Sequence, residues 1–233
     1  LILSPVSDGY ADAQIDDYGL DSNGRSQYPW LPGTYLSLRA RLSHSTDQLT
    51  GTAGFGFWNA PFADPNVRWP ALPQAAWFFF ASKPTDLPLA LEGPGRGWFA
   101  ATIDASTTAA LALIPLAPAV LILNQISSLR QRIWPAVRRR LQISYAPISC
   151  KTEVWHNYAL SWRPDGCAFL IDGRLVLETS FSPQGPLGFV CWIDNQYLIA
   201  TNRGRFAWGK LPTRYRQVLE VRDLHISRQT SER

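Results

Sequence analysis

Apolar and polar residues alternate along much of this chain. Between Tyr35 and Leu42 every even-numbered residue is Leu or Ala, and the odd-numbered residues are Tyr, Ser and Arg. The same period of two occurs at Tyr158, Leu160 and Trp162. Alternation of this kind predicts β-strands with one buried face and one solvent-exposed face.

Glycine and proline punctuate these stretches. Pro164-Asp165-Gly166 lies between two of them, and Asp172-Gly173 follows the second. An Asp-Gly pair between alternating stretches is the strongest short-range signal for a β-hairpin. Many short strands joined by such turns predict an all-β sandwich or barrel. A length of 233 residues fits one such domain, so we expect a single domain spanning residues 1–233.

One segment, residues 107–145, departs from this pattern. Residues 109–123 carry no polar side chain, but they include two prolines and fall short of the ~20 apolar residues of a membrane-spanning helix. Downstream, an apolar stripe with three- and four-residue steps predicts an amphipathic helix, kinked or restarted at Pro135. The stripe consists of Ile126, Leu129, Ile133, Val137 and Leu141. We therefore expect a helical insertion between two strands.

Charge is concentrated in the same region. From Ala105 to Thr152 there is no acidic residue, and five arginines and Lys151 give this stretch a charge of +6. The net charge of the whole chain is +4, which leaves −2 for the remainder. Nucleic-acid-binding proteins more often spread basic residues over a binding face, so we expect no nucleic-acid partner. The insertion could instead cover a cleft, contact a second subunit, or lie on an anionic membrane.

Composition adds three expectations. Charged residues make up 17% of the chain, below the usual ~25%, and ten residues are Trp, so either the buried fraction is large or an apolar surface meets a partner. The three cysteines lack C-x-x-C spacing, so we expect neither a disulfide framework nor a cysteine metal site, and no cofactor. Since the chain holds no Met, Leu1 is not expected to be its natural start. The expected location is the cytoplasm, with membrane association as an alternative.

The block from Trp155 to Gly173 is the most specific motif. It begins WHNYALSWRPDG and ends IDG. This resembles the Trp-His-x-Tyr-x-x-x-Trp-x-Pro-Asp and Asp-Gly signature of family 16 glycoside hydrolases, which belong to the concanavalin A-like lectin and glucanase superfamily. Weaker matches in the right order lie at residues 32–42, 54–62 and 219–227, so the resemblance covers roughly two thirds of the chain. It implies an all-β, two-sheet antiparallel jelly-roll sandwich with a ligand cleft on its concave face.

The catalytic strand of that family has no counterpart here. Its Glu-x-Asp-x-x-Glu motif supplies two carboxyl groups about 5–5.5 Å apart, one as nucleophile and one as acid/base. The resemblance places this strand after Trp69-Pro70-Ala71, on the segment Gln74–Phe80, which reads QAAWFFF. No Asp or Glu occurs between Asp64 and Asp86. We therefore expect no glycoside hydrolysis of the family type; the sequence leaves open whether another reaction is catalysed.

Aromatic residues occur where the family has acids; they either enlarge the core or, for at least one or two of them, line the concave face as a hydrophobic ligand pocket. The predicted ligand is a hydrophobic small molecule that is bound, isomerised or cyclised there. One alternative is a lectin-like module that binds a glycan without catalysis, and another is an interaction protein that uses the insertion at a membrane surface or in a homo-oligomer. The predicted ligand-binding residues are Trp58, Trp77, Phe79, Trp192, Asn195 and Gln196.

Two further groups of residues carry chemistry. His156 and Asp194 are the candidates for proton transfer, although a structural role is the more usual one for a histidine in the Trp155–Gly173 block. Asp12, Asp16 and Asp17 are the candidates for cation ligands, since hard cations prefer oxygen. Asp-rich turns are usually only solvated, so we expect no metal site.

Overall fold

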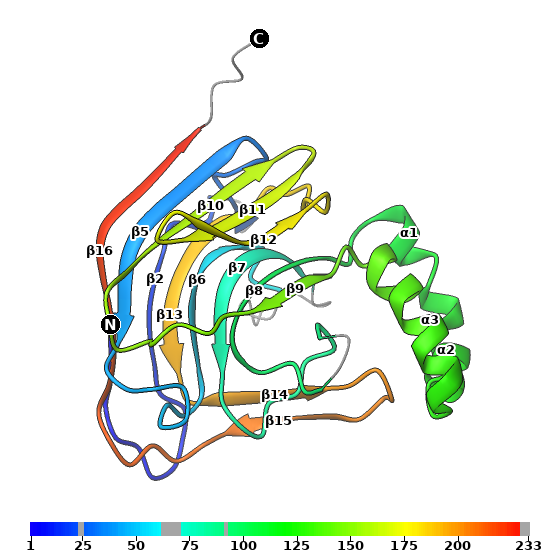
Figure 1. Ribbon diagram of the computed structural model, residues 1–233, viewed down its shortest axis with the longest axis horizontal. Coiled ribbons are helices and arrows are strands. Elements are labelled where there is room, and N and C mark those ends of the chain that lie inside the picture. Colours follow the sequence, from blue (N-terminus) through cyan, green and yellow to red (C-terminus); the bar gives the residue numbers. More distant parts are fainter. Residues whose placement is uncertain (23–25, 62–70, 91–92, 229–233) are drawn as a thin grey trace.

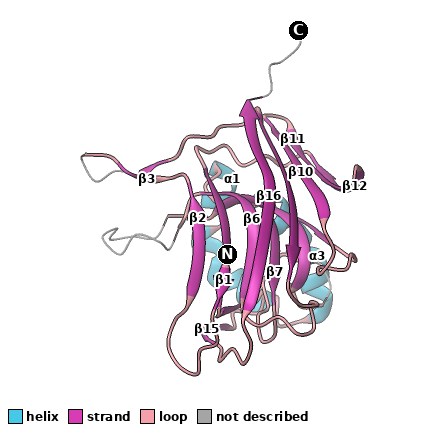
Figure 2. Cartoon of the chain, turned by 90° about the vertical axis from the view of Figure 1, so that its left-hand side faces the viewer, coloured by secondary structure: helices cyan, strands magenta, loops and turns pink. Residues whose placement is uncertain are grey.

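Two antiparallel six-stranded sheets pack face to face in the computed structural model, which describes residues 1–22, 26–61, 71–90 and 93–228 (Figures 1 and 2). The predicted all-β two-sheet architecture is thereby confirmed. Phe62, Trp69 and Pro70, which entered the family resemblance, lie outside the described residues.

One of the two sheets, here called the outer sheet, contains β5 and β10, the strands that the alternating sequence predicts. β5 pairs with β10 on one side and with β16 on the other. In spatial order its strands are β1 (Ile2–Leu3), β16 (Gln217–Arg228), β5 (Thr34–Leu42), β10 (His156–Arg163), β11 (Gly166–Ile171) and β12 (Arg174–Thr179).

The inner sheet carries the segment that lacks acids, as its strand β7. In spatial order its strands are β2 (Asp12–Asp16), β13 (Gly188–Asp194), β6 (Thr52–Trp58), β7 (Gln74–Ala81), β8 (Gly97–Asp104) and β9 (Ser144–Pro147). Two small pairs complete the β structure, β3 (Gly19–Leu20) with β4 (Ser26–Gln27) and β14 (Gln196–Ala200) with β15 (Phe206–Lys210).

The core lies between the two sheets and is rich in aromatic rings. Phe55, Phe78 and Tyr158 are all buried, and their ring centroids lie 5.0–5.5 Å apart. Side chains alternate across a strand, so the neighbours of the core-facing residues of β6, β7 and β13 point to the free face of the inner sheet. The core therefore decides which residues that face presents.

The Trp155–Gly173 block builds the hairpins of the outer sheet. β10 and β11 are joined at Pro164-Asp165, and β11 and β12 at Asp172-Gly173, where both residues have positive φ (51° and 75°). Positive φ at both turn residues is the type I′ geometry that Asp-Gly predicts. The two predicted hairpins are confirmed.

The insertion forms helices between β8 and β9, as predicted. They are α1 (Thr108–Leu111), the 3₁₀ turn η1 (Ile114–Leu116), α2 (Ala117–Leu123) and α3 (Ser127–Arg140). In Figure 1 they stand beside the sandwich as a separate layer. No helix among the described residues has the length and apolar character needed to cross a bilayer.

Of the two alternatives predicted at Pro135, the helix is not restarted there, since α3 runs through this residue; Pro135 is exposed, so water can satisfy the carbonyl that its ring leaves without a partner. The burial of the stripe differs from the prediction. The predicted apolar stripe is only partly buried: Val137 is buried, but Ile126 is exposed because the helix begins after it, at Ser127. Trp134 takes the remaining buried position on α3.

Candidate functional site

Four aromatic residues lie together on the free face of the curved inner sheet, here called the concave face. Trp58 comes from β6, Trp77 and Phe79 from β7, and Trp192 from β13, and these strands are neighbours. All four alternate with core-facing residues, so their rings point away from the core. The predicted walls of the ligand site are therefore brought together.

The four rings touch one another and form what we call the aromatic cluster. The centroids of Trp58 and Trp192 are 6.2 Å apart and their planes differ by only 5°. Trp77 lies 6.1 Å from Trp58 and 5.9 Å from Trp192, and Phe79 lies 5.2 Å from Trp192. Contacts at these distances contribute beyond simple burial.

Glycines in β6 make room for these rings. A Cβ atom on Gly54 would lie 2.3 Å from the carbonyl oxygen of Phe78 and 2.8 Å from Cη2 of Trp192. At Gly56, where φ is 150°, a Cβ would lie 2.8 Å from the Cβ of Trp77. Trp192 and Trp77 thus lie over backbone that has no side chain on the concave face.

Hydrogen bonds hold two of the indole rings in place. Trp58 Nε1 donates to the hydroxyl of Tyr18 (2.9 Å), and Trp192 Nε1 donates to Oγ1 of Thr52 (2.9 Å). The third indole differs: Nε1 of Trp77 is buried and has no acceptor among the described residues. A buried donor without a partner costs about 1–3 kcal/mol, so the position of the Trp77 ring is set by its packing against the other rings and not by a hydrogen bond.

Asp194 is linked to Trp192 through Thr52, whose hydroxyl accepts from the indole and donates to the carboxylate. Its Oδ1 accepts hydrogen bonds from the hydroxyl (2.8 Å) and the backbone N–H (3.2 Å) of Thr52 and from the backbone N–H of Gln196 (3.1 Å). Burial raises the pKa of this carboxyl above its ordinary value, although these donors act in the opposite direction. Asp194 orients Thr52, which in turn orients the Trp192 ring.

Part of the concave face is covered by the protein's own chain. Leu89 is buried against Phe99, Ala101 and Ile143, and Leu87 packs at the edge of this second apolar group. Trp192 itself is only 8% exposed, whereas Trp58, Trp77 and Phe79 are half-buried. The accessible aromatic surface is therefore centred on Trp58, Trp77 and Phe79.

The two predicted polar contacts have different environments. Asn195 is fully buried and bonded only to backbone: its Oδ1 accepts from Ala11 N, and its Nδ2 donates to the carbonyl oxygens of Gly9 and Leu211, at 2.9–3.0 Å. It therefore joins three chain segments and does not reach the concave face. Gln196 is half-buried and hydrogen-bonded to Tyr10, whose pKa is raised to about 12 chiefly by burial.

The structure does not bring His156 and Asp194 together, because they belong to different sheets. His156 lies on β10, with Nδ1 2.6 Å from Oδ2 of Asp172 and Nε2 3.1 Å from the carbonyl oxygen of Lys151. Asp172 also accepts the backbone N–H of Asn157 (2.8 Å). His156 thus connects β10 to the β11–β12 turn and to Lys151, and these contacts are structural.

The acidic candidates near the N-terminus are used in the fold. Asp17 accepts Nε1 of Trp30 (2.6 Å) and the backbone N–H of Phe189 (2.8 Å), and Asp16 accepts Nε2 of Gln14 (2.7 Å). Asp12 lies on β2, opposite Asp194 in the register. The described part of the chain contains no group of three potential metal ligands.

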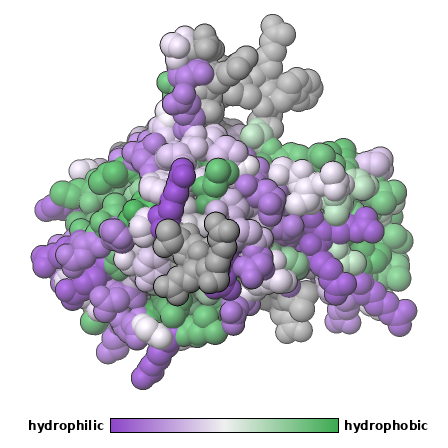
Figure 3. All heavy atoms as spheres, turned by 90° about the horizontal axis from the view of Figure 1, so that it is seen from above, coloured by the Kyte–Doolittle hydropathy of each residue, from purple (hydrophilic) through white to green (hydrophobic). Residues whose placement is uncertain are grey.

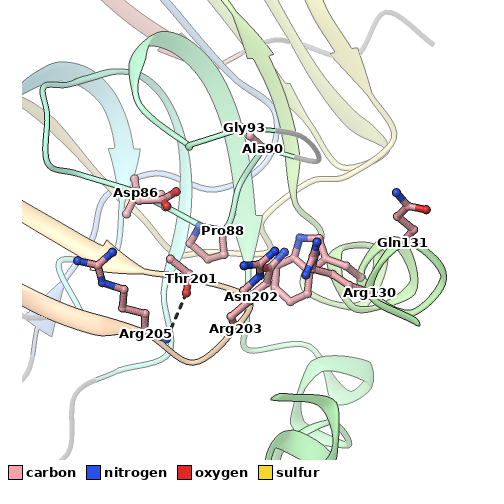
Figure 4. Close-up of a pocket in the computed structure, with 12 residues that line it drawn as sticks. Asp86, Pro88, Ala90, Gly93, Arg130, Gln131, Thr201, Asn202, Arg203 and Arg205 are labelled. Carbon is pink, nitrogen blue, oxygen red and sulfur yellow. Dashed lines mark hydrogen bonds between the residues drawn. The ribbon is translucent and has the colours of Figure 1, made fainter. Parts of the chain in front are cut away.

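A cavity of about 680 Å³ lies at another place, between the loop that follows β7, α3 and the β14–β15 turn (Figure 4). It is more polar than the aromatic cluster, and the close-up shows arginines from α3 and from the turn at its wall. Sequence reasoning missed it, because three segments far apart in the chain build it. Its lining includes Asp86, Pro88, Arg130, Trp134, Arg203 and Arg205.

Comparison with known proteins gives matches only among solved structures. No family model matches the chain, and no curated protein matches it. An endo-β-galactosidase from Clostridium perfringens, which releases GlcNAcα1-4Gal, is 14% identical with a TM-score of 0.42; the match covers 91% of this chain and 45% of that one. This chain thus spans less than half the length of that enzyme.

Two further structures have comparable scores. A Bacillus licheniformis β-glucanase is 12% identical over 82% of this chain and 67% of that chain, with a TM-score of 0.38. Rv0315 of Mycobacterium tuberculosis, described as an immunostimulatory antigen and pseudo β-1,3-glucanase, is 13% identical over 93% of this chain and 74% of that chain, with a TM-score of 0.42.

Proposed function

We propose that the concave face binds an apolar or aromatic small molecule without hydrolysing glycosides. The observation that carries this proposal is the aromatic cluster, whose Trp58, Trp77 and Phe79 rings remain partly exposed on the inside of a curved sheet. Ligand sites are typically concave and mostly apolar, with a few placed polar groups. Burying one such ring under a ligand contributes on the order of 1.5–3 kcal/mol.

The composition of β7 supports the absence of hydrolysis. The residues of this strand that point to the concave face are Ala75, Trp77, Phe79 and Ala81. A retaining glycosidase needs two carboxyl groups about 5–5.5 Å apart on that surface. Aromatic rings and methyl groups cannot supply a nucleophile or an acid/base pair.

Binding should be measured by calorimetry on the whole chain, with aromatic ketones and fatty acids compared with laminarin oligosaccharides. Trp77→Ala removes both the ring and the donor, and should weaken binding of an apolar ligand by about 10- to 100-fold. Trp77→Phe keeps an apolar ring of smaller area and should weaken binding less than Trp77→Ala does. Trp208→Ala, at a 68% exposed position on β15, is the matched control.

Two results would contradict the proposal. One is hydrolysis of a β-glucan that is abolished by a substitution in this chain. The other is ligand affinity that stays the same in Trp77→Ala and in Trp58→Ala, with both variants folded as judged by circular dichroism.

A glycan is the second candidate ligand, and a separate observation favours it. The partly exposed rings of Trp58 and Trp77 offer apolar surface, and exposed Gln14 and Asp16 lie on β2 at the edge of the aromatic cluster, where Gln14 pairs with Trp192. Sugar rings can stack their apolar faces on such a surface while polar side chains bind their hydroxyls. Calorimetric binding of oligosaccharides alone, lost in Trp58→Ala, would replace the first candidate with this one.

A further inference from the structure

The outer side of the insertion exposes more apolar surface than a soluble domain needs. No charged residue occurs between Asp104 and Arg130. Seven large aliphatic side chains in this stretch are 38–69% exposed, and we call them the insertion surface. They are Leu111, Ile114, Leu116, Leu121, Ile122, Leu123 and Ile126. Exposed apolar patches of this kind usually mark a contact with a partner protein, a ligand or a membrane.

The insertion is nevertheless fixed to the sandwich. Asn124 is fully buried, and its Nδ2 donates to the carbonyl oxygen of Asn202 in the β14–β15 turn (2.9 Å). Nε2 of Gln125 donates to the carbonyl oxygen of Arg203 (2.8 Å) in the same turn. Trp134 and Val137 are buried on the inner side of α3. The insertion is therefore a unit docked on the sandwich; Leu121 lies beside Gly204 of the β14–β15 turn, and the other members of the insertion surface are exposed to solvent.

Arginines accompany this apolar surface. With 3.6 residues per turn, Arg132 and Arg139 lie on the side of α3 opposite Trp134 and Val137, and both are exposed. Two positions add further exposed arginines. Arg140 is the last residue of α3, and the β14–β15 turn carries Arg203 and Arg205, which also line the cavity. In the described part of the chain none of these five arginines forms an ion pair. Figure 3 shows hydrophobic side chains gathered over the helices with hydrophilic ones beside them.

We propose that the insertion docks on an anionic lipid bilayer. The aliphatic side chains of α1, η1 and α2 would enter the interfacial region, and the arginines would contact lipid phosphates. The helices are too short to span, so the insertion lies in the plane of the membrane. Exposed Leu and Ile side chains suit acyl chains, which make no directional demands.

A second copy of the chain fits this surface less well. A two-fold contact brings the same patch of both copies together. The arginines of one copy would then face those of the other, and residues 105–152 contain no acidic side chain that could pair with them. An anionic bilayer supplies the opposite charge that the protein lacks.

The test is co-sedimentation of the whole chain with phosphatidylcholine vesicles, alone or mixed with about one third phosphatidylglycerol. The wild type should sediment with the anionic vesicles and not with the neutral ones. Arg132→Gln with Arg139→Gln should weaken binding by about 25-fold, since each basic residue near the surface contributes about fivefold. Leu116→Ser with Ile122→Ser should reduce binding at least as strongly.

Matched controls keep the result specific. Ile15→Ser replaces an exposed isoleucine on β2, at the opposite edge of the inner sheet, and Arg228→Gln replaces an exposed arginine at the end of β16. Both should bind the anionic vesicles like the wild type. All variants should keep the affinity of the concave face for its ligand, which separates this test from that of the proposed function.

Two outcomes would overturn the proposal. Vesicle binding that is absent in the wild type, or equal in the wild type and in both double variants, shows that the insertion surface does not bind lipid. A wild type that is dimeric without vesicles and becomes monomeric in Leu116→Ser with Ile122→Ser assigns the surface to a second copy.

Discussion

The protein has two apolar surfaces beyond its core, and they differ in every physical property that decides what they can bind. The aromatic cluster lies on the inside of a curved sheet and is built from rings, and two of its three indoles are held by hydrogen bonds to Tyr18 and Thr52. The insertion surface lies on the helical layer, is built from aliphatic side chains, and is flanked by arginines that form no ion pair with any described residue. Rings held in place on a concave face suit one discrete ligand. Exposed aliphatic side chains on the helical insertion suit a lipid bilayer.

The difference also concerns stability. In the aromatic cluster each ring is packed against another ring and against backbone, so a change of shape has to displace neighbours. On the insertion surface the side chains contact solvent, and a change alters little in the folded state. Substitutions that change the size of a side chain should therefore lower the unfolding free energy in the aromatic cluster and leave it almost unchanged on the insertion surface.

The largest effect is expected for Gly54→Val. Its new side chain would meet the carbonyl oxygen of Phe78 at 2.3 Å and the ring of Trp192 at 2.8 Å, so β7 or the ring must move. We expect a loss of roughly 3 kcal/mol or more of unfolding free energy, measured by urea denaturation. Ala119→Val, at an exposed position on α2, is the control and should change stability by less than about 0.5 kcal/mol. Equal effects at the two positions would contradict the comparison.

A smaller loss is expected where the insertion joins the sandwich. Asn124→Ala removes the buried donor to Asn202 and leaves that carbonyl without its partner, at a cost of about 1–2 kcal/mol. Gln125→Ala, the exposed neighbour that bonds to the same turn, should cost only a few tenths of a kcal/mol. Hydrogen exchange should accelerate in α2 and leave β6 and β7 unchanged; acceleration across the inner sheet would show that the insertion is part of the core.

The strands and hairpins could be predicted from the sequence, because residues close together in the chain determine them. Alternation identified β5 and β10, and Asp172-Gly173 identified a turn that needs positive φ at both residues. The aromatic cluster was also predictable, since alternate positions of β6, β7 and β13 must share a face. The contact of His156 with Asp172 is one step off the hairpin register: Tyr158 pairs with Ile171, so Asn157, the neighbour of His156, lies opposite Asp172.

What the sequence left hidden depends on contacts between distant segments. Asn195 follows an apolar strand like many site residues, but Gly9 and Leu211 bury it, and nothing local indicates their approach. Leu87 and Leu89 cover part of the concave face for the same reason. Ile126 belongs to the apolar stripe by spacing, but it lies outside α3 because the helix begins one residue later.

The carboxyl of Asp194 offers a test by pH. Burial raises its pKa above the ordinary value of 3.8, so the folded state binds a proton more readily than the unfolded state. The stability of the wild type should therefore rise relative to Asp194→Asn as the pH falls from about 7, and the gain should level off below the ordinary pKa. Urea denaturation at several pH values measures this difference. A difference that is constant with pH, or that falls as the pH falls, would contradict the assigned environment of Asp194.

The smallest effect on stability is expected for Ile122→Ser, and it isolates function from folding most cleanly. Ile122 is 69% exposed, so replacing it removes almost no buried contact, and the unfolding free energy should stay within about 0.5 kcal/mol of the wild type. The same substitution removes an aliphatic side chain from the proposed bilayer contact and should weaken vesicle binding several-fold, since a buried aliphatic side chain contributes on the order of 1.5–3 kcal/mol. Urea denaturation and vesicle co-sedimentation of one preparation measure both quantities. A marked loss of stability would mean that Ile122 packs against the protein itself, and the insertion surface would then belong to the core, like the residues beneath the aromatic cluster.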